Sequence, residues 1–304
     1  MSIRSYLLFS IYRFEYWMQK INKKGAAYML ALQDVTKKYG NQVALDEVNI
    51  NIKEGEIVGL VGPNGSGKTT LMKILNGLIV NYEGEVVRNE SIGALIESPK
   101  YFEHKSGLYN LKYFNDLFGT KQDVGKLLEQ LNMDHYKKKS VKKYSMGMKQ
   151  RLGIALALTA QPEYLILDEP TNGMDPSGVR EVLRYLRRIA ERNNIGMLIS
   201  SHILSDIESL CDKVYLIHNG KIKKEHRPLV GFAVEDKDIG KIEHILLDMQ
   251  DASITDNGIV KVPKSESKKV SQLFDEHGIE IKQIEEKSVS LEEMYFDMVE
   301  EDYK

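Results

Sequence analysis

The sequence predicts an α/β protein with a doubly wound parallel sheet. From residue 30 onward, short apolar runs alternate with segments whose apolar residues repeat at helical spacing, a pattern typical of strands joined by helices. The run EYLILDE at residues 163–169 is largely apolar, as expected for a strand buried on both faces. The run EIVGLVG at residues 56–62 leads into the loop GPNGSGKT and then into KTTLMKILNGL, which has helical periodicity. These observations favour parallel strands with helices on both faces of the sheet.

The later elements continue the alternation. A helix is predicted from Pro176 onward, where apolar residues recur at helical intervals. Residues 195–202, IGMLISSH, predict another buried strand, and the segment SDIESLC after it has a helical pattern. Residues 213–224 predict a β-hairpin, because Asn219-Gly220 is a dipeptide that two-residue hairpin turns prefer.

Two regions depart from this alternation. Residues 101–160 contain three segments of helical period, so we expect a helical insertion there. The tail, about 229–304, reads as strand, helix, two strands around Asp256-Asn257-Gly258, helix, strand and closing helix, an order that suggests a small ferredoxin-like α+β domain. The expected organisation is an N-terminal extension at 1–28, a main domain at 29–226 and a C-terminal α+β domain at 227–304.

The N-terminal segment allows two interpretations. Residues 1–28 mix aromatic side chains with arginine and lysine, which suits a helix lying in a membrane interface. The alternative is an extension outside the fold, produced by an upstream start codon, with Met29 beginning the domain. We favour the extension, because an amphipathic pattern alone is weak evidence.

Composition excludes several classes of protein. The chain has 304 residues, 42% hydrophobic and 28% charged, which is ordinary for a globular protein with a sizeable core. The formal net charge of -2 gives no general attraction to nucleic acid or to an anionic membrane. The single cysteine excludes an internal disulfide. The most apolar stretch, residues 6–14, is too short to span a bilayer and contains Arg13.

The loop GPNGSGKT at residues 62–69 predicts a phosphate site. It matches the P-loop pattern and lies between a predicted strand and a predicted helix. Its glycines let backbone N–H groups surround phosphates at the helix N-terminus. Lys68 can reach the β- and γ-phosphates, and the Thr69 hydroxyl can bind Mg²⁺.

Acidic and basic groups follow two of the buried strands. Asp168 ends one strand and can hold the metal, while Glu169 is placed to polarise an attacking water. His202 ends the next strand, so it should emerge at the same edge of the sheet, where an imidazole can bond a γ-phosphate or the attacking water. We therefore expect Glu169 and His202 to be catalytic.

A second small, flexible patch stands in the basic segment KKYSMGMKQR at residues 142–151. Ser145 and Gly147 expose backbone N–H groups beside positive charge, which again suits a phosphate. The alternative is a basic face that binds nucleic acid or nothing. One chain would not need two phosphate sites for a single nucleotide, so the second patch raises the question of whose phosphate it holds.

The motifs together resemble the ATP-binding subunit of an ABC transporter, over roughly residues 30–225. GPNGSGKT is similar to Walker A, YSMGMKQR to the ABC signature loop, LILDEP to Walker B and GMDP to the D-loop, and Ser201-His202 resembles the switch region. The resemblance implies a P-loop NTPase fold that hydrolyses ATP with Mg²⁺. It also implies head-to-tail packing of two subunits, in which the signature loop closes on the γ-phosphate of the partner's ATP.

The resemblance assigns roles to individual residues. Those expected to bind ATP are Tyr39, which would stack on adenine, and Gly62, Asn64, Gly65, Ser66, Gly67, Lys68, Thr69, Thr70, Ser145 and Gly147. Those expected at the metal are Thr69, Asp168 and Glu97.

The sequence departs from the family pattern at two positions. The signature reads SMGMK rather than Ser-Gly-Gly-Gln, which keeps Ser145 and Gly147 but adds methionines at the interface. Glu97 replaces the usual Q-loop glutamine after SIGALI. A glutamate there resembles the subgroup that exports lantibiotics and bacitracin-like peptides, and the ending SLEEMYFDMVEE is similar to that of drug- and peptide-export subunits.

The leading hypothesis is therefore the ATPase of a peptide exporter, located peripherally at the cytoplasmic face of the cell membrane. Its permease subunits would be separate membrane-spanning chains, docked on aromatic residues between Tyr101 and Phe118. Those aromatic residues could instead form the core of the insertion. The alternatives are an ABC subunit for another substrate and a soluble ABC ATPase acting on ribosomes or DNA. The single ATP module, without a coiled coil or a strongly basic tail, disfavours the soluble class.

Overall fold

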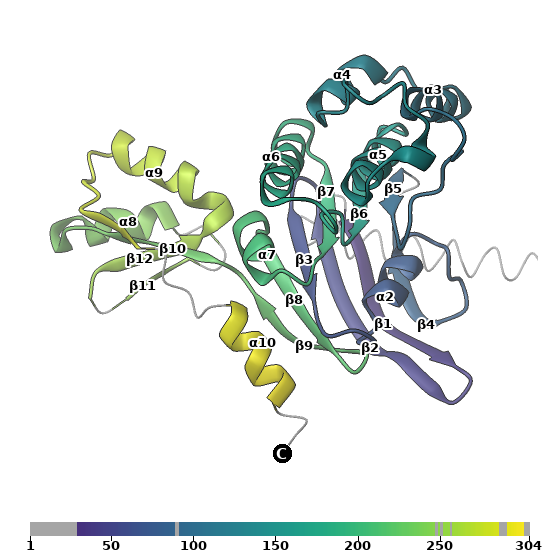
Figure 1. Ribbon diagram of the computed structural model, residues 1–304. Coiled ribbons are helices and arrows are strands. Elements are labelled where there is room, and N and C mark those ends of the chain that lie inside the picture. Colours follow the sequence, from purple (N-terminus) through teal and green to yellow (C-terminus); the bar gives the residue numbers. More distant parts are fainter. Residues whose placement is uncertain are drawn as a thin grey trace, which may run out of the picture.

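The computed structural model describes residues 29–88, 91–246, 249, 252–255, 257–285 and 291–300. The extension expected at residues 1–28 and Asp256 of the expected turn lie outside these ranges. Figure 1 follows the chain from the purple strands at the start of the described residues to the yellow helix at its end.

A six-stranded sheet forms the centre of the main domain. Its strands, in spatial order, are β5 (Ile92–Leu95), β6 (Tyr164–Asp168), β7 (Gly196–Ser200), β3 (Ile57–Val61), β8 (Lys213–His218) and β9 (Lys221–His226). The first five are parallel and β9 pairs antiparallel with β8. Every residue of β3, β6, β7 and β8 is buried, which confirms strands covered on both faces.

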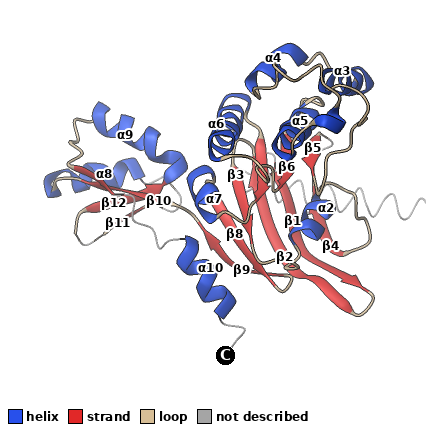
Figure 2. Cartoon of the chain, viewed as in Figure 1, coloured by secondary structure: helices blue, strands red, loops and turns tan. Residues whose placement is uncertain are grey.

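Different layers cover the two faces of this sheet. The helices α5 (Met146–Leu158), α6 (Pro176–Asn193) and α7 (Leu204–Leu210) share a core cluster with Leu165 and Leu167 of β6. Residues Tyr164 and Ile166 of the same strand belong to the opposite cluster, because successive side chains of a strand point to opposite faces. Figure 2 shows the red strands between these layers.

The second face is covered by α2 (Lys68–Leu75) and by a separate antiparallel sheet. That sheet has the order β2-β1-β4, with β1 at Met29–Tyr39, β2 at Gln42–Lys53 and β4 at Glu83–Val87. The expected alternation of strands and helices from residue 30 is wrong here. A tight turn at Gly40-Asn41 joins β1 directly to β2 and leaves no room for a helix.

The helical insertion consists of α3 (Gly107–Phe118), α4 (Val124–Gln130), a short 3₁₀ turn at Val141–Lys143, and α5. The Ser106 hydroxyl accepts the N–H of Tyr109 and so caps the start of α3. Asp123 caps α4 in the same way, through the N–H of Lys126. In Figure 1 these teal helices stand at one end of the parallel sheet.

The tail forms a second, four-stranded sheet. Its spatial order is β11 (Ser253–Ile254), β12 (Ile259–Pro263), β10 (Leu229–Ala233) and β13 (Gln283–Glu285), with antiparallel neighbours throughout. The helices α8 (Ile239–Leu246) and α9 (Ser267–Glu276) share a core with this sheet. The element order and the strand order match the α+β arrangement expected from the sequence.

The closing helix α10 (Leu291–Glu300) lies outside that second core. Its buried residues Leu291 and Met298 belong to the core cluster of the main domain, which also contains Ile207 of α7 and Leu216 of β8. Figure 1 shows this helix apart from α8 and α9. The division at residues 226 and 227 stays a prediction, and α10 belongs to the second range although its core contacts lie with the first.

Within the described residues, no helix has both the length and the apolar character required to cross a membrane.

Candidate active site

A cavity of about 460 Å³ lies where the parallel strands end. Its walls come from β1, β2, the loop after β3, α2, the segment after β5, the end of β6 with the residues that follow it, and the start of α5. The residues named from the sequence that line it are Tyr39, Asn64, Gly65, Gly67, Lys68, Thr69, Thr70, Glu97, Asp168 and Glu169. Gly62, Ser66, Ser145, Gly147 and His202 do not line it.

The glycine-rich loop connects β3 to α2 through conformations that favour glycine. Gly65 has φ of 81° and Gly67 has φ of 109°, values that side-chain-bearing residues rarely adopt. A Cβ on Gly67 would also lie 2.6 Å from the carbonyl oxygen of Ala44. The loop leaves the hydroxyl of Ser66 buried without a hydrogen-bond partner among the described residues. The first N–H groups of a helix have no partner within that helix, so this loop and the start of α2 suit a ligand rich in hydrogen-bond acceptors.

Lys68 is folded back onto its own loop. Its Nζ donates to the carbonyl oxygens of Gly62 at 2.7 Å and Pro63 at 3.0 Å. Burial lowers the pKa of Lys68, while the carboxylates of Glu169 and Asp168 oppose that shift. The Lys68 ammonium group thus lines the same cavity as the carboxylates of Asp168 and Glu169.

Asp168 is held from two sides. Its Oδ2 accepts a hydrogen bond from Thr69 Oγ1 at 3.1 Å, and its Oδ1 accepts one from Ser200 Oγ at 2.6 Å. Ser200 also accepts the backbone N–H of Glu169 at 3.0 Å. Ser200 is not among the site residues predicted from the sequence. The available signal was a serine ending a buried strand beside the strand that ends in Asp168.

Glu169 and His202 lie together, as their positions after neighbouring strands predict. Because Asp168 pairs with Ser200 across β6 and β7, the residues that follow emerge at one edge. His202 Nδ1 lies 3.2 Å from Glu169 Oε2. Glu169 has φ of 47°, a left-handed conformation uncommon outside glycine and typical of constrained functional positions.

The signature segment begins α5. Ser145 caps this helix, since its hydroxyl accepts the N–H of Met148 at 3.3 Å. Gly147 is buried beside the Gly173 backbone, and a Cβ there would lie 3.2 Å from the Gly173 carbonyl oxygen. Neither residue faces the cavity of its own chain. Met146, which stands between them, does line it.

Comparison with known proteins identifies the family. Residues 45–172 match the ABC transporter family model. The chain is 37% identical to the bacitracin transport ATP-binding protein BcrA of Bacillus licheniformis over 294 residues, 88% of this chain and 95% of that protein. It is 40% identical over 204 residues to the lantibiotic transport ATP-binding protein SrtF of Streptococcus pyogenes, covering 64% of this chain and 89% of the relative. The chain belongs to the ATP-binding subunits of ABC transporters.

The fold agrees with this assignment. The ATP-binding cassette MJ0796, solved as a dimer in a post-hydrolysis state with ADP and Pi, superimposes with a TM-score of 0.61 at 24% identity over 65% of this chain and 98% of that chain. The family, the P-loop α/β fold and the assignment as an ATPase, all expected from the sequence, are thus confirmed.

In this ABC subunit, the cavity is lined by side-chain oxygen atoms that could bind a metal ion, but not by a complete set of protein ligands. No group of three His, Cys, Asp or Glu side chains able to hold a metal occurs in the part of the chain that the structure describes. Mg²⁺ that binds with a nucleotide needs only one or two protein ligands beside the phosphates and water. The Thr69 hydroxyl, hydrogen-bonded to Asp168, therefore fits such an ion.

Glu97 lies just after β5 and faces the same cavity. Its Oε1 accepts a hydrogen bond from Lys73 Nζ at 2.6 Å. That hydrogen bond, followed by the charge of Lys73, lowers the pKa of Glu97. In this structure the carboxylate is thus an ionised partner of a lysine on α2, a contact that the sequence analysis did not foresee.

Two further contacts complete the ABC site. Tyr39, expected to stack on adenine, is 51% exposed at the cavity, and Lys37 Nζ lies 4.8 Å from its ring centroid. Gln150, also missed, lines the cavity, and its Nε2 lies 3.4 Å from the carbonyl oxygen of Glu169. Gln150 joins the signature helix to the residue expected to activate water.

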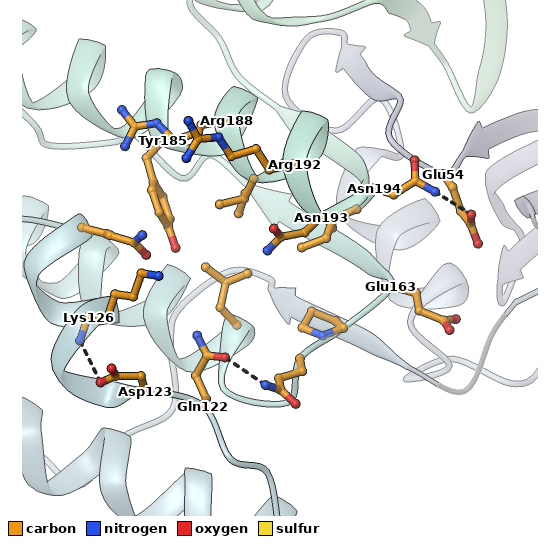
Figure 3. A pocket seen from close by; sticks show the side chains of 16 residues that line it. Glu54, Gln122, Asp123, Lys126, Glu163, Tyr185, Arg188, Arg192, Asn193 and Asn194 are labelled. Carbon is orange, nitrogen blue, oxygen red and sulfur yellow. Dashed lines mark hydrogen bonds between the residues drawn. The ribbon is translucent and has the colours of Figure 1, made fainter.

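A larger cavity, about 590 Å³, lies between α4 and the end of α6. Figure 3 shows Asp123 and Lys126 on one side of it and Tyr185, Arg188 and Arg192 on the other. None of the residues assigned to the ABC site lines this larger cavity.

Proposed function

We propose that this chain is the ATP-hydrolysing subunit of an ABC exporter for lantibiotic- or bacitracin-like antimicrobial peptides, serving resistance or immunity. The observation that carries the ATPase role is the convergence of Lys68, Asp168 and Glu169 on one cavity beside a glycine-rich loop. The peptide class is supported by the similarity to bacitracin and lantibiotic transport ATP-binding proteins and by the glutamate at position 97.

The residues divide the work of hydrolysis. The loop N–H groups and Lys68 hold the β- and γ-phosphates, and Thr69 with Asp168 would hold Mg²⁺. Mg²⁺, when bound, neutralises charge on the phosphates. Glu169 orients the attacking water and accepts its proton, while His202, 3.2 Å from the Glu169 carboxylate, aligns that group. Ser200 positions both acids through its bonds to Asp168 and to the Glu169 N–H.

The complete site requires two copies of the chain. Ser145 and Gly147 stand at the N-terminus of a helix of 13 residues and do not line the cavity of their own chain, although Met146 between them does. That terminus carries the positive end of the helix dipole and suits a γ-phosphate. The head-to-tail arrangement places it on the partner's ATP, so the nucleotide joins the two halves. The dimeric MJ0796 cassette offers a precedent for pairing.

The permease partners would dock on an aromatic cluster at the start of the helical insertion. Phe102 on the preceding loop packs against Tyr113 of α3, with ring centroids 5.0 Å apart. Large side chains of this region are between 41% and 62% exposed, namely Phe102, Tyr109, Tyr113, Leu117 and Phe118. Exposed aromatic groups of this kind mark interaction surfaces. The partners are separate membrane-spanning subunits, and the chain works peripherally at the cytoplasmic face of the membrane, without nucleic acid.

The test is survival of cells that carry the complete transporter under a lantibiotic or bacitracin challenge. Wild-type cells should survive doses that kill cells carrying Lys68→Ala. Glu97→Gln should weaken resistance while leaving ATP binding nearly intact, because a neutral amide replaces a charge between the metal site and the surface that meets the permease. Equal survival of all three across the candidate peptides would remove the peptide class from the proposal.

A further inference from the structure

Three carboxylates border the nucleotide cavity, and each has a different partner. Asp168 accepts hydrogen bonds from Thr69 and Ser200, and Glu169 lies beside His202. Glu97 is paired with Lys73, which does not line the cavity. The third carboxylate is therefore held by a cation outside the site, although it borders the same space as the other two.

The pair has a defined geometry. Lys73 follows Thr69 by four residues on α2, so the two side chains lie on one face of the helix, roughly 6 Å apart along its axis. Glu97 has φ of 61°, a left-handed conformation that is uncommon for a residue with a side chain. The Lys73 side chain is 28% exposed and that of Glu97 is 61% exposed. The pair is thus accessible. Lys73 lies one helical turn from Thr69, and Glu97 lines the same cavity as Thr69.

On the basis of the proposed function, we propose that Lys73 is the partner of Glu97 in the absence of nucleotide. Lys73 then competes for this carboxylate with the divalent cation that enters with the nucleotide. When the nucleotide binds, the Glu97 carboxylate leaves Lys73 and contacts the divalent cation instead. A neutral glutamine at this position would not need such a counter-charge.

The energetics favour an easy exchange. An exposed ion pair shifts an equilibrium by no more than about fivefold, because water and salt already screen both charges. A divalent cation carries twice the charge of lysine, and carboxylate oxygens are ligands that Mg²⁺ and Mn²⁺ prefer. Lys73 therefore sets a small, removable barrier to metal binding, and that barrier exists only while Glu97 is present.

A competing explanation assigns Lys73 to its own helix. Lys73 lies in the last turn of α2, where a cation stabilises the helix dipole. That role would be independent of Glu97. A double-mutant cycle separates the two explanations, because only competition makes the effect of Lys73 depend on residue 97.

The experiment is a Mn²⁺ titration, followed by electron paramagnetic resonance, of the full chain with saturating ADP. The proteins are wild type, Lys73→Met, Glu97→Gln and the double variant. Lys73→Met should tighten Mn²⁺ binding by up to about fivefold, Glu97→Gln should weaken it, and Lys73→Met should have no effect in the Glu97→Gln background. Lys137→Met is the matched control, since Lys137 pairs with Asp134 at 2.5 Å and is 30% exposed but lies outside the cavity.

Three results would overturn the inference. Lys73→Met could bind Mn²⁺ no more tightly than wild type. Lys73→Met could raise the Mn²⁺ affinity equally in the wild-type and Glu97→Gln backgrounds, or Lys137→Met could raise that affinity as much as Lys73→Met does. If the wild-type chain with ADP binds no Mn²⁺ at all, the proposed function fails together with the inference. If the wild-type chain binds Mn²⁺ and the four proteins have the same Mn²⁺ affinity, the proposed function stands and only the competition between Lys73 and the cation is refuted.

Discussion

Two polar cavities of the main domain differ in how their side chains are used. In the larger one, between α4 and α6, Gln161 pairs with Gln122 and Asn194 pairs with Glu54. In the smaller one, charged groups that follow separate strands line one shared space, and in the loop that borders it the Ser66 hydroxyl has no hydrogen-bond partner among the described residues. Volume does not distinguish the two cavities, about 590 Å³ against 460 Å³. Convergence of charged groups on a helix N-terminus marks the site.

A pair of substitutions tests this contrast most strongly. Lys68→Ala should lower ATP turnover by about 10²–10³-fold, because it removes a preorganised cation from the phosphates. Arg188→Ala, in the larger cavity, should leave turnover at the wild-type level and the free energy of unfolding within about 0.5 kcal/mol. The measurements are steady-state phosphate release and chemical denaturation. A large loss of turnover in Arg188→Ala would show that the larger cavity takes part in the reaction.

A smaller change in ATP turnover is expected when two variants are mixed, each of which damages a different half of the nucleotide site. Lys68→Ala damages the loop of its own cavity, while Ser145→Arg damages the site on the partner. Mixed subunits should form dimers with one doubly damaged site and one intact site, so mixing the two inactive proteins should restore part of the turnover. Normal hydrolysis by Ser145→Arg alone would contradict a composite site.

The sequence was sufficient where local pattern determines structure. The loop at residues 62–69, the buried strand ending in Asp168 and the hairpin at Asn219-Gly220 all depend on neighbouring residues, and the structure has them as predicted. Asn219 and Gly220 both have positive φ, as a tight two-residue hairpin turn requires.

The features that escaped prediction depend on tertiary arrangement. Ser200 meets Asp168 only because β6 and β7 pair in one particular register. Lys73 meets Glu97, 24 residues away in sequence, only because α2 and the β5 region pack in one apolar cluster. Periodicity shows which face of an element is buried, but it does not show which partner buries it. For this reason α10 could be predicted as a helix, while its packing on the main domain could not.

The central claim is that one ATP is hydrolysed between two copies of this chain with Glu169 as the base. Glu169→Gln tests it most directly, with ATP turnover and sedimentation measured on the same protein in ATP and Mg²⁺. Turnover should fall by about 10²–10⁴-fold, while ATP still binds. An ATP-dependent dimer should accumulate, because the nucleotide joining the halves is no longer cleaved. Hydrolysis at the wild-type rate by Glu169→Gln would show that Glu169 is not the base.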